Sequence, residues 1–161
     1  MSESHVAQKK SYRALVNKIQ GVVQHRGKSR NDKLKKIVES LAENITAFDW
    51  VGFYLVDAQA NCELVLGPYV GKETEHTRIP FGTGICGQAA DTHQTFVVQD
   101  VSEADNYLAC SIHVKAEIVI PIMRENEFVA ELDIDSHQKN AITKEHQEML
   151  EEICNIVAEI F

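Results

Sequence analysis

The sequence predicts one α+β domain in which helices at the two ends of the chain flank an antiparallel sheet. Apolar residues recur at helical spacing near both ends, whereas they alternate with polar residues in the middle of the chain. Short polar turns join successive alternating segments, which is typical of antiparallel strands. With 161 residues, of which 44% are hydrophobic, the chain can bury a core without disulfides or metal. Helices at the two ends are expected to pack on one sheet face and to leave the other face free for a pocket.

Three helices are expected from apolar stripes, which cover residues 12–23, 34–45 and 149–160. Gly27 marks the end of the first helix, because glycine commonly follows a helix C-terminus. Either Asn31 or Asp32 is available to cap the second helix, and Thr143 is available to cap the third. Cys154 adjoins the last apolar stripe, so we expect it to be a core residue rather than a reactive thiol.

The alternating middle of the chain is expected to form the strands Asp49–Asp57, Cys62–Tyr69, Thr95–Val98, Glu117–Met123 and Phe128–Ile134. The polar stretch Ala58–Asn61 connects the first two strands as a hairpin. Between the second and third strands, Gly82–Asp91 is a glycine-punctuated entry into a short helix. Cys62 falls in a strand beside Leu64 and Leu66, so we expect it to be structural.

Charge is distributed unevenly along the chain, whose formal net charge is −8. Residues 1–36 hold ten Lys and Arg against two acids, a net +8, whereas residues 37–161 hold six against 22, a net −16. We divide the chain into a basic N-terminal helical segment, residues 1–30, and a domain, residues 31–161. An acidic body disfavours nucleic acid as the main ligand. We expect the basic helix to pack beside this acidic domain or against that of a partner.

The sequence also bears on compartment and redox state. No apolar run approaches the roughly 20 residues that a membrane span requires, and the polar start lacks the apolar stretch of a signal peptide. Four cysteines without a C-x-x-C pair are too few for a disulfide scaffold. These features predict a cytoplasmic protein with reduced thiols and no membrane contact.

The segment Phe128–Asp135 carries an unusual row of acids. Because side chains alternate across a strand, Phe128, Ala130, Leu132 and Ile134 are expected on one face and Val129, Glu131, Asp133 and Asp135 on the other. This acidic face is either solvated or covered. If it is covered, burial and mutual repulsion raise the pKa of at least one carboxyl. Such a cluster can hold an ammonium group and keep one carboxyl protonated as a general acid.

Two cysteines stand in segments suited to chemistry. Cys86 lies between glycines near a predicted helix N-terminus, where backbone N–H groups favour a thiolate. Cys110 follows a polar stretch that is typical of a loop, so the two thiols could form a transient disulfide if the fold brings them together. No metal site is expected, because His76, His93 and His113 lack paired ligand spacing.

Trp50 and Tyr54 are four residues apart on a predicted strand and therefore share a face. Aromatic side chains in this arrangement are more often core residues. Beside a carboxylate-lined pocket, they could instead form a wall for a small cation or thioether.

Seven motifs occur in an order that resembles the free methionine-(R)-sulfoxide reductases, a family built on a single GAF domain. These motifs are DWVGFYL (49–55), LGPY (66–69), RIP (78–80), GTGICG (82–87), LAC (108–110), EIVIP (117–121) and LDIDS (132–136). The resemblance runs from about residue 34 to the C-terminus. It implies a GAF fold, with a central antiparallel sheet of about six strands, the terminal helices on one face and a ligand pocket on the other.

The resemblance also implies an enzyme that reduces free methionine sulfoxide without a cofactor. Cys110 corresponds to the nucleophile and Cys86 to a resolving or assisting thiol. The substrate-binding positions of the family correspond to Trp50, Tyr54, Glu117, Asp133 and Asp135. A thioredoxin-type reductant would reset the disulfide, and the family likeness suggests a homodimer.

The chain differs from the family pattern at positions that matter for function. The family usually carries a further cysteine where this chain has Glu73–His76, and Gly-Val where this chain has Ala130-Glu131. These differences keep a second hypothesis open, in which the chain is a stand-alone GAF sensor of a small molecule or of redox state, without reductase activity.

Overall fold

A computed structural model describes residues 2–60, 62–107 and 112–161. Six antiparallel strands form one sheet in the order β3-β2-β1-β6-β5-β4. The strands are β1 (Trp50–Val56), β2 (Glu63–Val70), β3 (Arg78–Pro80), β4 (Phe96–Val98), β5 (Ala116–Arg124) and β6 (Glu127–Ser136). The helices are α1 (Glu3–Gln24), α2 (Arg30–Asn44), α3 (Gly84–Thr92) and α4 (Lys144–Val157), with short 3-10 turns η1 (Val101–Glu103) and η2 (Ala158–Ile160). The α+β prediction is confirmed.

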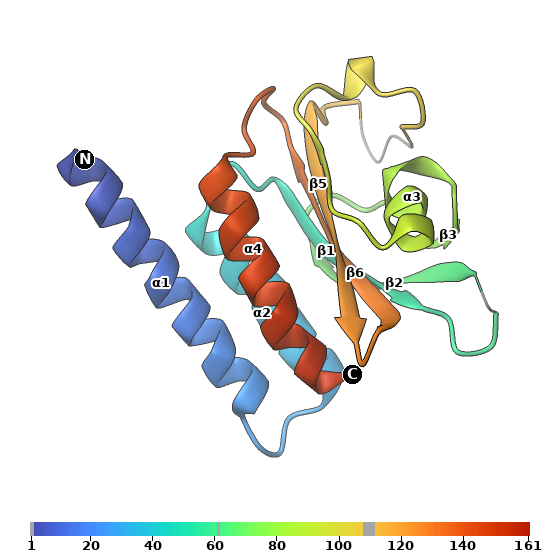
Figure 1. Ribbon diagram of the computed structural model, residues 1–161, viewed down its shortest axis with the longest axis horizontal. Helices are drawn as coiled ribbons and strands as arrows, with labels where there is room; N and C mark the ends of the chain where they lie inside the picture. The colour runs from blue at the N-terminus through green and yellow to red at the C-terminus, as the bar shows by residue number, and fades with distance from the viewer. Residues whose placement is uncertain (1, 61, 108–111) are drawn as a thin grey trace.

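The elements stack in layers around the sheet (Figure 1). Helices α1, α2 and α4 lie on one side of the sheet, and α3 lies on the other. The larger core, between the terminal helices and the sheet, is centred on buried residues such as Ile19, Ile37, Leu132 and Leu150. A smaller apolar cluster lies under α3, on the face that carries the acidic row. The predicted placement of the terminal helices on one face is confirmed.

Serine and threonine side chains fix where the long helices begin. Ser2 accepts a hydrogen bond from the His5 N–H at the start of α1, and Ser29, rather than Asn31 or Asp32, caps α2. Thr143 caps α4 as predicted.

The basic segment packs on the acidic part of the chain. Helix α1 buries Leu15, Val16, Ile19 and Val23, and its Arg13 forms a bidentate ion pair with Glu152 of α4 at 2.7 and 3.1 Å. Within the described ranges, no helix combines the length and hydropathy needed to span a membrane.

Strand β6 departs from the predicted alternation near its N-terminal end. A register irregularity pairs Ile122 with Ala130 but Met123 with Phe128, so that Val129 is an extra residue in β6. Consequently Phe128 packs in the cluster under α3, whereas Val129 packs against the helix-side core. The predicted faces of Phe128 and Val129 are therefore wrong, while those of residues 130–135 are confirmed.

The structural interpretation of Cys62 is also wrong. Cys62 precedes β2 in an exposed turn, with a backbone φ of 67°. Cys154 is buried in the core as predicted. Strand β3 was not expected from the sequence, because its three residues are too few to show a period.

Gly87 allows α3 to lie directly against the turn after β3, and an alanine there is expected to be destabilising. A Cβ at Gly87 would lie 2.7 Å from the Pro80 carbonyl oxygen and 3.0 Å from the Gly82 nitrogen, both backbone atoms. We expect Gly87→Ala to lower the free energy of unfolding in urea by about 1–3 kcal/mol. Gly21→Ala is the matched control, because nothing lies within 4 Å of its Cβ. That exposed helical position should gain about 0.5–1 kcal/mol. Equal effects of the two variants would contradict this packing.

Candidate functional site

The neighbouring strands β1, β6 and β5 lie beneath α3, and β6 and β5 carry the acidic side chains. Their register forms the cross-strand rows Trp50–Asp135–Glu117, Gly52–Asp133–Val119 and Tyr54–Glu131–Pro121. Since side chains opposite one another in a sheet point to the same face, Glu117 joins the three acids of β6. The Trp50 ring fills the space that a Cβ at Gly52 would need, so the glycine lets the ring lie flat on this face.

The four carboxyl groups are shielded from solvent. Glu131 is 0% exposed, Asp133 and Asp135 are 1% exposed, and Glu117 is 4% exposed. A solvated acidic face is therefore wrong for this chain, and the covered alternative is confirmed. Burial raises the pKa of Glu131 well above its usual value, and the neighbouring Asp133 carboxyl raises it further. Burial likewise raises the pKa of Asp133.

Cys86 projects from the first turn of α3 into this acidic cluster. Its thiol Sγ lies 3.9 Å from Glu117 Oε1. Burial, followed by the charges of Asp133, Glu131 and Glu117, raises the pKa of the Cys86 thiol well above its usual value. The predicted position near a helix N-terminus is confirmed, but the predicted preference for a thiolate is wrong. The carboxyl groups and the loss of hydration outweigh the helix dipole, so Cys86 rests as a thiol.

The raised pKa of Glu131 predicts that its effect on stability depends on pH. A carboxyl whose pKa is higher in the folded than in the unfolded protein contributes full stability below the unfolded value, near 4.5, and loses it as the pH rises through the folded value. The melting temperature of Glu131→Gln should therefore be close to that of the wild type near pH 4.5. It should exceed the wild-type value by a growing margin as the pH rises toward 8. Thermal melts of both proteins at matched pH values measure this difference. A constant difference across that range would contradict a buried, titrating Glu131.

Aromatic rings form one wall of the acidic face. The Trp50 ring stacks on Tyr69, with centroids 5.4 Å apart, and faces Tyr54 at 6.3 Å. Trp50 and Tyr54 are also held by hydrogen bonds. Trp50 Nε1 donates to the Lys72 carbonyl at 3.1 Å, and the Tyr54 hydroxyl donates to the His76 carbonyl at 2.8 Å. The predicted shared face of Trp50 and Tyr54 is confirmed.

Two cavities adjoin the acidic residues. One, of about 10 Å³, is lined by Cys86, Glu117 and Asp133 together with His76, Ile79, Thr83, Gly84 and Ile85. The other, of about 60 Å³, is lined by Trp50 and Asp135 together with Asp49, Lys72, His113, Val114 and His137. Both are much smaller than the roughly 300–1,000 Å³ of pockets for drug-sized molecules, so the acidic face is almost closed in this structure.

Asn106 ties the segment before Cys110 to the start of α3. Its side-chain amide accepts a hydrogen bond from the Gly84 N–H at 3.1 Å and donates to the Gly82 carbonyl at 3.1 Å. Cys110, the predicted nucleophile, lies outside the described residues. Sequence reasoning did not single out Asn106, since an isolated asparagine in a loop carries no pattern that identifies its partner.

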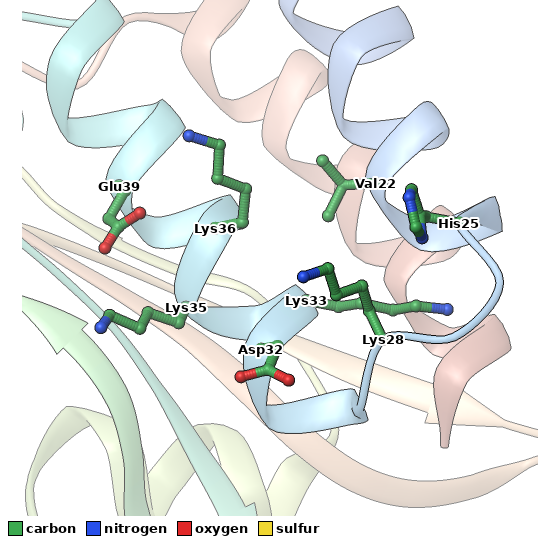
Figure 2. Close-up of a pocket in the computed structure, with 8 residues that line it drawn as sticks. All are labelled: Val22, His25, Lys28, Asp32, Lys33, Lys35, Lys36 and Glu39. Carbon is green, nitrogen blue, oxygen red and sulfur yellow. The ribbon is translucent and has the colours of Figure 1, made fainter.

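A separate basic groove lies on the helical side of the sheet, between the end of α1 and the start of α2 (Figure 2). The groove is lined by Val22, His25, Lys28, Asp32, Lys33, Lys35, Lys36 and Glu39. Lys33 already serves the fold, because its ammonium donates to the Val23 carbonyl near the end of α1 at 2.6 Å. The sheet separates this groove from Cys86 and the acidic row.

Comparison with known proteins agrees with the fold and the motifs. A family model for the GAF domain matches residues 29–160. GAF domain-containing protein A of Dictyostelium discoideum is 32% identical over 151 residues, which are 94% of this chain and 92% of that protein. Free methionine-R-sulfoxide reductase of Escherichia coli K12 is 37% identical over 113 residues, 70% of this chain and 66% of that protein.

A solved structure gives the same result. Free methionine-R-sulfoxide reductase from Neisseria meningitidis, solved by X-ray in complex with its substrate, is 36% identical and superposes with a TM-score of 0.85. The match covers 93% of this chain and 87% of that one. Fold, motifs and relatives agree: the chain belongs to the GAF domain family and, within it, to the free methionine-R-sulfoxide reductase group.

Proposed function

We propose that the protein is an oxidoreductase that reduces free L-methionine (R)-S-oxide to L-methionine. The observation that carries this proposal is the buried set of carboxyl groups around the Cys86 thiol. Its relatives include proteins named free methionine-R-sulfoxide reductase at 37% and 35% identity, which favours the reductase over a GAF sensor without activity.

The acidic face suits a free amino acid. Glu117, Asp133 and Asp135 offer carboxyl oxygens to an ammonium group, which a methionine residue inside a peptide lacks. Trp50 and Tyr54 offer aromatic faces to the sulfur-bearing side chain. The proposed substrate-binding residues thus combine a cation-binding part with an apolar part.

The proposed chemistry transfers two electrons from two thiols to the sulfoxide. The Cys110 thiolate attacks the sulfoxide sulfur, and a carboxylic acid, kept protonated by burial, protonates the sulfoxide oxygen. The S–O bond breaks, and the oxygen leaves on Cys110 as a sulfenic acid while methionine is released. Cys86 then gives its proton to a neighbouring carboxylate and attacks the Cys110 sulfur. The same proton passes from the carboxyl to the departing hydroxyl oxygen, so that water leaves as the disulfide forms. Asn106 supports this pairing, because it holds the chain four residues before Cys110 against the start of α3.

Partners follow from the same proposal. A thioredoxin-type dithiol would reduce the disulfide in a reducing compartment such as the cytoplasm. A homodimer is proposed from the family likeness.

A single-turnover experiment tests the proposed disulfide. Reduced protein, freed of other reductants, is mixed with excess free methionine (R)-sulfoxide, and we expect one methionine per chain together with a Cys86–Cys110 disulfide in peptide mass spectrometry. A persistent Cys110 sulfenic acid would refute Cys86 as the resolving thiol. If no methionine is formed, the reductase proposal is wrong.

A further inference from the structure

We infer that the basic groove between α1 and α2 binds a compact oligophosphate, an anion with several phosphate groups such as a nucleoside triphosphate. The groove has a volume of about 420 Å³, against about 10 and 60 Å³ for the two cavities at the acidic face. This volume falls within the range of small-molecule pockets, roughly 300–1,000 Å³. The groove and Cys86 lie on opposite sides of the sheet, so the inference does not depend on the proposed reductase activity.

The groove concentrates positive charge on a chain that is acidic as a whole. Residues 22–39 hold six Lys and Arg against two acids, a net +4, whereas the entire chain carries −8. Farther along α1 the charges are mixed, because the next hollow places Lys9 and Arg13 beside three glutamates of α4. A polymer that extends beyond the groove therefore meets these glutamates, whereas a small anion does not. This distribution favours a compact anion over nucleic acid or a membrane surface.

Lysine side chains in the groove keep charge available for a ligand. No ion pair in the described ranges involves Lys28 or Lys36, and Lys28 extends from the connection between the helices toward α2 (Figure 2). Lys33 donates one hydrogen bond to a carbonyl near the end of α1, which positions its ammonium and leaves two N–H groups for a ligand. The acid Asp32 is engaged in the fold, since it accepts a hydrogen bond from the serine that caps α2 at 2.8 Å.

The donor set matches several phosphate groups rather than one. Lysine ammonium groups bind phosphate oxygens as point charges, and Lys28, Lys33 and Lys36 supply three of them from separate positions. His25 adds a ring nitrogen that can donate a hydrogen bond. The half-buried Val22 offers an apolar surface beside these groups, on which a nucleobase can pack. A nucleoside triphosphate supplies both the phosphates and the base, and inorganic tripolyphosphate supplies the phosphates alone.

Isothermal titration calorimetry of the full chain with inorganic tripolyphosphate, and separately with ATP, tests the inference. We expect saturable binding of both anions, with an affinity that falls as salt is added, because salt screens exposed charges. The double variant Lys28→Gln with Lys36→Gln should lower the affinity for both by roughly 10- to 100-fold. Lys33 is retained in this variant, because its hydrogen bond to the Val23 carbonyl serves the fold.

The matched control, Lys10→Gln with Lys144→Gln, has the same net charge as the test variant. Both lysines are exposed and neither lines the groove, so its affinity should stay within about 2-fold of the wild type. Equal losses in the two double variants, or no saturable binding of either anion to the wild type, would overturn the site. Binding to phosphatidylserine vesicles without binding of the free anions would also overturn it. None of these measurements involves turnover, so the result is distinct from the outcome of the reductase assay.

Discussion

Cys110→Ser is expected to lower turnover of free methionine (R)-sulfoxide by on the order of 1,000-fold or more. A serine hydroxyl is far less acidic and less nucleophilic than a thiol, and it cannot take the sulfoxide oxygen as a sulfenic acid. Steady-state consumption of NADPH through thioredoxin and thioredoxin reductase measures this loss.

Cys62→Ser is the matched control for the Cys110 variant. Cys62 is exposed in the turn before β2, and the proposed mechanism does not use it. We expect full activity from this variant and a wild-type melting temperature. Activity retained in Cys110→Ser would contradict the assignment of the nucleophile.

Asp133→Asn is expected to lower activity while it raises stability. Asp133 is buried between Gly52 and Val119, beside the Glu117 carboxyl and the Cys86 thiol. Loss of a charged contact with the substrate ammonium should reduce kcat/KM by roughly 10- to 100-fold. Removing the buried charge should raise the free energy of unfolding at pH 7 by about 1–3 kcal/mol.

The opposite signs of these two effects distinguish a functional acid from a structural one. Urea unfolding and the coupled assay, applied to the same preparation, give both quantities. Asp91→Asn is the matched control, because it makes the same chemical change at an exposed position of α3. A variant that loses both stability and activity would show that Asp133 serves the fold.

Local sequence pattern was sufficient to predict which acids share a face. The period of two in β6 placed Glu131, Asp133 and Asp135 together, and strong pairing with β1 and β5 keeps that period intact. The same reasoning failed at Phe128, because a bulge changes the face of a side chain without changing the composition of the strand. Cys62 was misassigned because Leu64 and Leu66, which follow it, indicated a strand. Cys62 itself lies in the turn before β2 with a positive φ.

The electrostatic state of Cys86 required tertiary structure. The sequence predicted the helix N-terminus beside it, which favours a thiolate. It did not reveal that β5 and β6 place three carboxyl groups around the thiol in a site closed to water. Burial depends on contacts between α3 and strands more than 30 residues away, and no local pattern encodes them.

Substrate choice tests the central claim most directly, since the acidic face is proposed to bind the ammonium of a free amino acid. The measurement compares kcat/KM for free methionine (R)-sulfoxide and its N-acetyl derivative in the thioredoxin-coupled assay. We expect the free amino acid to be preferred by at least about 100-fold, because the acetylated substrate leaves buried carboxylates unpaired. Equal values for the two substrates, or turnover of the N-acetyl derivative alone, would contradict the account.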